Sequence, residues 1–73
     1  MNDLFLVRAI NEGIQNNFTS LVDAVVCAHK SGKVVVHSNS GNYWVVSFAN
    51  ALVLVEAGYS IASLPESQLQ VNE

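Results

Sequence analysis

Two short runs of strand-forming residues, separated by a dense turn signal, constrain the fold of this chain most strongly. Residues 33–37 (Lys-Val-Val-Val-His) are rich in β-branched side chains, and residues 43–48 (Tyr-Trp-Val-Val-Ser-Phe) combine aromatic and β-branched ones. Residues 38–42 (Ser-Asn-Ser-Gly-Asn) between them are all typical of turns. This pattern predicts a β-hairpin that turns at about residues 39–41.

The register of this hairpin decides which of its side chains share a face. A two-residue turn at Ser40 and Gly41 would place Val35 and His37 on one face with Trp44 and Val46. The other face would then carry Val34, Val36, Tyr43, Val45 and Ser47. Both faces are largely apolar, so we expect other elements to cover the hairpin on both sides.

Two helices are expected to precede the hairpin. Apolar residues recur at four-residue spacing after a capping Asn2 or Asp3, which predicts a first helix to about residue 16. Ser20 and Asp23 resemble a capping box for a second helix at about residues 20–31, and Gly32 suits the left-handed residue after it. The residues expected to be buried are Leu6, Val7, Ile10 and Ile14 in the first helix, and Leu21, Val22, Val25, Cys27 and Ala28 in the second.

The segment after the hairpin fits either a helix or a strand. Phe48, Leu52, Val55 and Tyr59 form a helical stripe, so we expect a helix over residues 49–57. A short strand over residues 59–64 follows and ends at Pro65, and Leu69 and Val71 are expected to anchor the tail. The order ααββαβ predicts a single α+β domain, residues 1–73, with a small three-stranded sheet.

The low charge of so apolar a chain points to a protein partner. Of its 73 residues, 51% are apolar and 12% are charged, about half the usual charged fraction. A chain of this size buries only about 60% of the surface that its unfolded form exposes. We therefore expect another protein to cover part of the apolar surface, either a second copy in a homodimer or a different partner.

The same sequence argues against several other classes of protein. The chain has three basic residues, Arg8, Lys30 and Lys33, and six acidic ones, so we expect no nucleic-acid partner. The start of the chain lacks the positive region of a signal peptide, and no apolar run approaches the ~18 residues that span a bilayer. The single cysteine excludes an intramolecular disulfide and fits a reducing compartment. We expect a cytoplasmic protein without a membrane segment.

No catalytic, cofactor or metal site is expected. Cys27 and His29 are two residues apart on one helix and point to different sides, so the histidine is badly placed to activate the thiol. Cys27 is better explained as a small buried residue, and Asp23 as a helix N-terminal carboxylate. Gly32 and Lys33 lack the other residues of a phosphate-binding loop. Cys27 and the two separate histidines, His29 and His37, cannot complete a four-ligand zinc site without a carboxylate.

The hairpin turn is the expected partner-binding site. It is the most polar stretch of the chain and is flanked by residue types that are favoured in contact surfaces. No charged residue lies between Val34 and Phe48, so a strand edge there would have no charge to prevent pairing with another chain. The residues expected to bind a partner are His37, Asn39, Asn42, Tyr43 and Trp44.

The sequence favours a non-catalytic protein-binding module. Its size and acidity are typical of regulators and inhibitors, including accessory proteins of phages and mobile elements. One alternative is a small DNA-linked transcriptional regulator that uses the helix pair, which would require a basic surface on the second helix. Another is a small-ligand binder or enzyme, which would require a pocket that joins His37 or Cys27 to a carboxylate.

Overall fold

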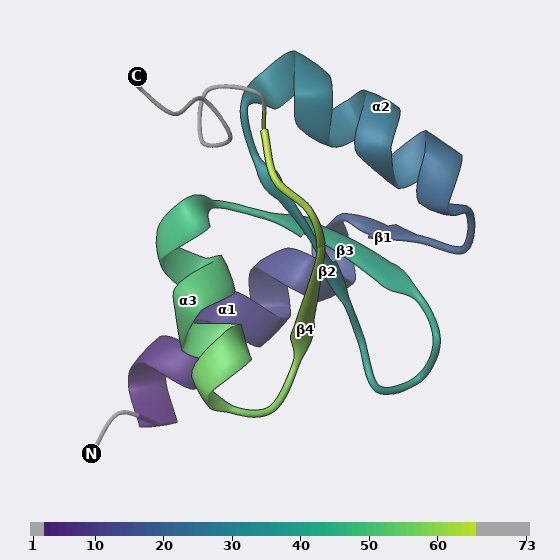
Figure 1. Cartoon of the computed structure of the whole chain (residues 1–73). Coiled ribbons are helices and arrows are strands. Elements are labelled where there is room, and N and C mark those ends of the chain that lie inside the picture. The colour runs from purple at the N-terminus through teal and green to yellow at the C-terminus, as the bar shows by residue number, and fades with distance from the viewer. Residues whose placement is uncertain (1–2, 66–73) are drawn as a thin grey trace.

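The computed structural model describes residues 3–65, and these residues form an α+β domain (Figure 1). The elements in chain order are α1 (Asp3–Gln15), β1 (Asn17–Phe18), α2 (Leu21–Ser31), β2 (Val34–His37), β3 (Tyr43–Val46), α3 (Phe48–Glu56) and β4 (Ser60–Ser63). The expected α+β class is confirmed, with one additional two-residue strand, β1. The expected tail anchors, Leu69 and Val71, lie outside the described residues.

The caps of α2 lie where the sequence predicts. The Ser20 side chain accepts a hydrogen bond of 3.4 Å from the backbone N–H of Asp23 at the start of α2. Gly32 follows α2 with a φ of 69°, a left-handed conformation that favours glycine. Residues 48–56 form a helix, and the Ser47 side chain caps it by accepting from the N–H of Asn50 at 3.2 Å.

The hairpin forms as expected, but its register differs by one residue from that of a two-residue turn. His37 pairs with Tyr43 and Val36 with Trp44, so residues 38–42 form a five-residue loop. The Ser38 N–H donates to the Asn42 carbonyl at 2.8 Å and closes this loop. Because a one-residue change moves side chains to the opposite face, the expected grouping of the faces is wrong. Val34 and Val36 share a face with Trp44 and Val46, and Val35 and His37 share the other with Tyr43 and Val45.

The sheet is antiparallel, in the order β1-β3-β2-β4. Both hairpin strands therefore lie inside it, with β1 beside β3 and β4 beside β2. The expectation that the hairpin leaves an unguarded edge is wrong, because the segments before and after it in the chain fold back onto its two sides. The edges belong to the two-residue β1 and the four-residue β4.

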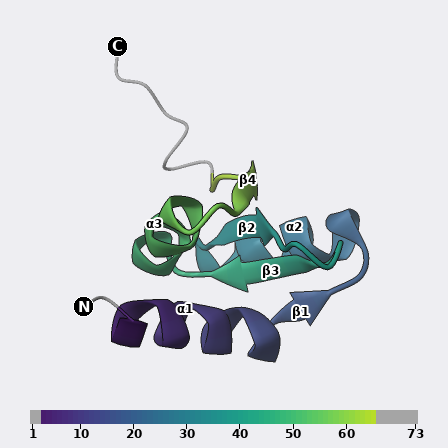
Figure 2. The same cartoon turned by 90° about the horizontal axis from the view of Figure 1, so that it is seen from below.

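Helices cover both faces of the sheet, which confirms the expectation from the apolar hairpin. Figure 2 shows α1 and α3 on one side and α2 on the other. Under α1 and α3 the buried core consists of Ala9, Val34, Val36, Trp44, Val46, Ala51 and Leu54. Under α2 a smaller core consists of Ala24, Ala28, Val35 and Val45.

Small residues, more than large ones, bring the helices against the sheet. Ala9, Ala24 and Ala28 are buried, whereas Val7 and Ile14 of α1 are more than half exposed. The expectation that Val7, Ile14, Leu21 and Val22 are core residues is wrong. Large side chains of the helices also reach the cores, since Leu54 is fully buried and Leu6 and Ile10 pack against the core from α1.

Candidate functional site

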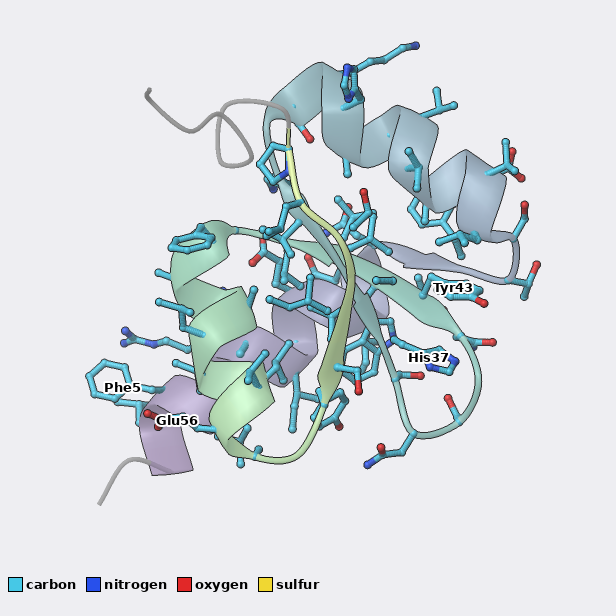
Figure 3. All side chains as sticks on the ribbon, viewed as in Figure 1. Phe5, His37, Tyr43 and Glu56 are labelled. Carbon is cyan, nitrogen blue, oxygen red and sulfur yellow. The ribbon has the colours of Figure 1, made fainter. Side chains whose placement is uncertain are left out.

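A stacked pair of rings marks the end of the hairpin. His37 and Tyr43 face each other across β2 and β3, with ring centroids 5.1 Å apart and planes inclined by 22°. His37 is exposed, and Tyr43 is half-buried against the core beneath α2. Figure 3 shows both rings beside the loop that joins the two strands. The pair thus presents an aromatic surface whose inner ring is fixed by packing.

The loop beside these rings is held by its own hydrogen bonds. The Ser38 side chain, which is only 3% exposed, contacts the Ser40 hydroxyl at 2.9 Å and accepts from the Asn42 N–H at 3.2 Å. The Gly41 N–H donates to the Ser38 carbonyl at 3.1 Å, and Gly41 adopts a φ of 94°. These bonds hold the loop in one conformation.

Two side-chain amides at this loop remain available. Asn39 is exposed and Asn42 is half-buried, and neither amide group forms a hydrogen bond within the described part of the chain. An amide offers both donors and an acceptor. Four of the five expected binding residues, His37, Asn39, Asn42 and Tyr43, therefore come together at one end of the sheet. We call these four residues the hairpin tip.

Trp44 is separated from the hairpin tip. It points to the opposite face of the sheet, is 8% exposed, and lies against Tyr59 with ring centroids 5.3 Å apart. A Cβ atom built on Gly13 would overlap the Trp44 ring, so α1 lies directly on the indole. A partner at the hairpin tip would not reach Trp44, because the sheet lies between them.

The carboxylate of Glu12, which the sequence analysis did not single out, links three parts of the fold. The Glu12 carboxylate of α1 accepts hydrogen bonds from the Ser47 backbone N–H at 3.0 Å and the Asn50 side-chain amide at 2.7 Å. It also forms an ion pair of 3.0 Å with the Lys33 ammonium group. These partners lie 21 to 38 residues away in sequence, so no local pattern could have indicated them.

The electrostatics of Glu12 follow from these contacts. Partial burial alone raises the pKa of its carboxyl group, but the three hydrogen bonds and the charge of Lys33 outweigh this effect. The pKa of Glu12 therefore lies below its ordinary value of 4.5. Two of the partners of the charged carboxylate, the Ser47 N–H and the Asn50 amide, lie at the start of α3. Glu12 therefore has a structural role, because it connects α1 to the start of α3.

Cys27 is half-buried and packs against the core under α2. His29, on the same helix, is exposed. Among residues 3–65, no group of three His, Cys, Asp or Glu side chains is arranged to hold a metal ion.

The basic residues do not form a common surface. Lys33 is engaged by Glu12, which leaves Lys30 as the other lysine at the end of α2. Arg8 is on α1, and α1 and α2 lie on opposite faces of the sheet (Figure 2). The basic surface that a DNA-linked regulator would need on the second helix is reduced to Lys30.

Among the described helices, none has the length and apolarity required to cross a membrane. Comparison of the chain with protein-family models, with curated proteins and with solved structures gives no match.

Proposed function

We propose that this chain is a non-catalytic protein-binding module and that the hairpin tip contacts its partner. The observation that carries the proposal is the His37–Tyr43 stack at the exposed end of the sheet. Rigid aromatic residues provide contact area at a low entropy cost, and neighbouring amides provide adaptable hydrogen bonds. The internally bonded loop fixes the positions of both.

The rest of the surface supports a protein as the ligand. Eleven large apolar residues of the described chain are between 38% and 69% exposed, on all three helices and β4. Contact surfaces in proteins combine aromatic anchors with apolar surroundings and few charges. From β2 to the end of the described residues, Glu56 is the one charged side chain. A partner protein that covers the surface of β2, β3, α3 and β4 would therefore remove few charged side chains from water.

A regulator or inhibitor is the activity that fits such a module. A module without a reaction of its own acts by occupying a surface of its target, and a preordered tip suits this role. The single cysteine fits a reducing compartment, so we assign the action to the cytoplasm.

The test compares matched charge substitutions in affinity purification from cells of the source organism. His37→Glu adds one negative charge at the hairpin tip, and Gln15→Glu adds the same charge on the exposed surface of α1. We expect a specific protein to be retained by the parent and by Gln15→Glu and to be lost with His37→Glu. Circular dichroism and urea unfolding must show that both variants fold.

Binding that survives His37→Glu as well as Gln15→Glu would place the contact elsewhere on the molecule. If the folded parent retains no specific protein from the extract, the protein-binding function is wrong. Turnover of a substrate by the purified chain would overturn its non-catalytic assignment.

A further inference from the structure

The outer edge of β4 is the open side of the sheet. β4 ends the strand order, so one of its edges has no neighbouring strand among residues 3–65. The opposite edge belongs to β1, which is only two residues long. In the chain, β1 closely follows α1 and is soon followed by α2. β4 contains no charge and no proline, the residues that usually prevent an edge strand from pairing with another chain.

The hydrogen-bond pattern shows which backbone groups of β4 point outward. Bonded and non-bonded pairs alternate along an antiparallel ladder. Because Ser38 donates to Asn42 across the hairpin, the backbone groups of His37 turn away from β3 and toward β4. Ser60, which pairs with His37, faces back toward β2. The N–H and C=O of the next residue, Ile61, therefore point to the open edge.

The side chain of Ile61 joins this edge to an apolar surface on α3. Ile61 pairs with Val36, so it lies on the face of the sheet that α1 and α3 cover, and it is 38% exposed. Phe48, Leu52 and Val55 are 39% to 49% exposed and follow one another at helical spacing. We call Phe48, Leu52, Val55 and Ile61 the edge patch.

The edge patch faces away from α1. Asn50 of α3 binds Glu12 of α1, which fixes the flank of α3 that α1 occupies. At 100° per residue, the stripe of three residues lies on roughly the opposite flank of α3 from Asn50. The helix contacts both β2 and β4, and Figure 2 shows α3 on the β4 side of α1. The stripe and the open strand edge therefore border the same side of the molecule.

We propose that a second copy of this chain occupies this side, with β4 paired antiparallel to β4 of the other copy. A two-fold axis perpendicular to the sheet makes such an edge self-complementary when a residue faces its own counterpart. Ile61 meets the requirement, since its outward N–H and C=O can bond to the same groups of the other Ile61. The two sheets then form one continuous sheet, and the two α3 stripes lie on its same face.

The distribution of charge favours a second copy over a charged target. The chain has a net charge of −3, so two copies repel each other wherever acidic residues face one another. Glu56 is the one charged residue from position 48 to position 65. It follows Leu52 by four residues on α3 and so borders the edge patch, whose four residues themselves carry no charge. A strongly acidic or basic target would find no counter-charge on it.

A dimer interface of ordinary size would cover a modest part of the accessible surface. A standard interface covers about 800 Å² on each partner, and this chain has 4631 Å² of accessible surface. About one sixth of the surface would have to be covered. Residues 48–63, which supply α3 and β4, are roughly a quarter of the described chain and contribute four of its exposed large apolar residues.

Light scattering after size exclusion tests the dimer. The chain mass is 7.9 kDa, and we expect the parent to elute with twice this mass at micromolar concentration. Ile61→Lys places a charge at the two-fold axis and is expected to give the single-chain mass. Val22→Lys adds the same charge to an outward position of α2, which is 69% exposed, and is expected to remain dimeric.

Disulfide trapping tests the register in the folded protein. In a Cys27→Ser background, Ile61→Cys is expected to form an intermolecular disulfide, since facing residues of paired strands lie about 5.5 Å apart at Cα. Ser63→Cys is the control. In the same register two copies of residue 63 are offset by four residues, about 13 Å along the strand, and should not cross-link.

A parent of single-chain mass, a dimer that persists in Ile61→Lys, or equal cross-linking at positions 61 and 63 would overturn the proposal. His37 pairs with Ser60 of β4, but the rings of the hairpin tip lie on the α2 face of the sheet and the edge patch lies on the α1 and α3 face. These outcomes therefore do not decide whether the hairpin tip binds a partner. Conversely, a His37→Glu variant that is still dimeric but no longer captures the partner would support both the hairpin-tip contact and the β4 pairing.

Discussion

At the scale of single residues, Gly13 shows how a position that weakens a helix can strengthen a fold. Alanine at an exposed helical position is favoured over glycine by about 1 kcal/mol. Here the added methyl group would overlap the Trp44 ring, so α1 would have to move away from the sheet. We predict that Gly13→Ala lowers the free energy of unfolding by about 1–3 kcal/mol, measured by urea denaturation.

Asn11→Ala is the matched control for this change. Asn11 is exposed on the same helix, where alanine improves helix propensity without meeting the sheet. Its free energy of unfolding is expected to rise by roughly 0.5 kcal/mol. A Gly13→Ala variant that is as stable as the parent would mean that α1 does not lie directly on the indole.

Glu12 makes stability depend on pH. Its pKa is lowered in the folded protein from an ordinary value of 4.5, so the charged form is favoured by folding. The resulting stabilisation is complete above the unfolded pKa and is lost as the pH falls through the folded one. We predict that the free energy of unfolding declines from about pH 5 downward and that Glu12→Gln makes this decline shallower.

The comparison uses urea denaturation at several pH values between neutral and acidic. At pH 7, Glu12→Gln is expected to cost about 1 kcal/mol, because glutamine keeps an oxygen acceptor but loses the charge that pairs with Lys33. Equal pH slopes in the two proteins would show that Glu12 gains nothing from its partners in the folded state.

At the scale of elements, local sequence determines most of the fold and long-range contacts determine the rest. Caps, turn residues and β-branched runs predict the three helices, the hairpin and the final strand. They do not predict the register of the hairpin, because a loop of two residues and a loop of five both fit residues 38–42. The loop that forms depends on Ser38, whose hydroxyl and backbone bond within the turn.

Local sequence predicts most of the candidate site, but it does not predict the features that depend on the hairpin register. His37, Asn39, Asn42 and Tyr43 come together because they are neighbours in the turn, so local reasoning finds them. Trp44 is different, since its face depends on the register and its burial depends on Gly13, 31 residues earlier in the chain. The short strand β1 is likewise defined only by its pairing with β3.

At the scale of the whole molecule, a single sheet joins two separate cores. The valines of β2 alternate between them, with Val34 and Val36 in the core under α1 and α3 and Val35 in the core under α2. Neither layer can be lost without exposing one face of the same strand. This arrangement predicts that the two layers unfold together, as a single cooperative domain.

The one tryptophan of the chain allows a direct test of this cooperativity. Trp44 belongs to the core under α1 and α3, and Ala24 belongs to the core on the other face. Ala24→Gly weakens α2 by about 1 kcal/mol through helix propensity without touching the tryptophan. We predict that the urea midpoint of Trp44 fluorescence falls together with the midpoint of far-UV circular dichroism at one protein concentration. A fluorescence midpoint that stays at the parent value, while the dichroism signal declines earlier, would mean that α2 unfolds separately from the other layer.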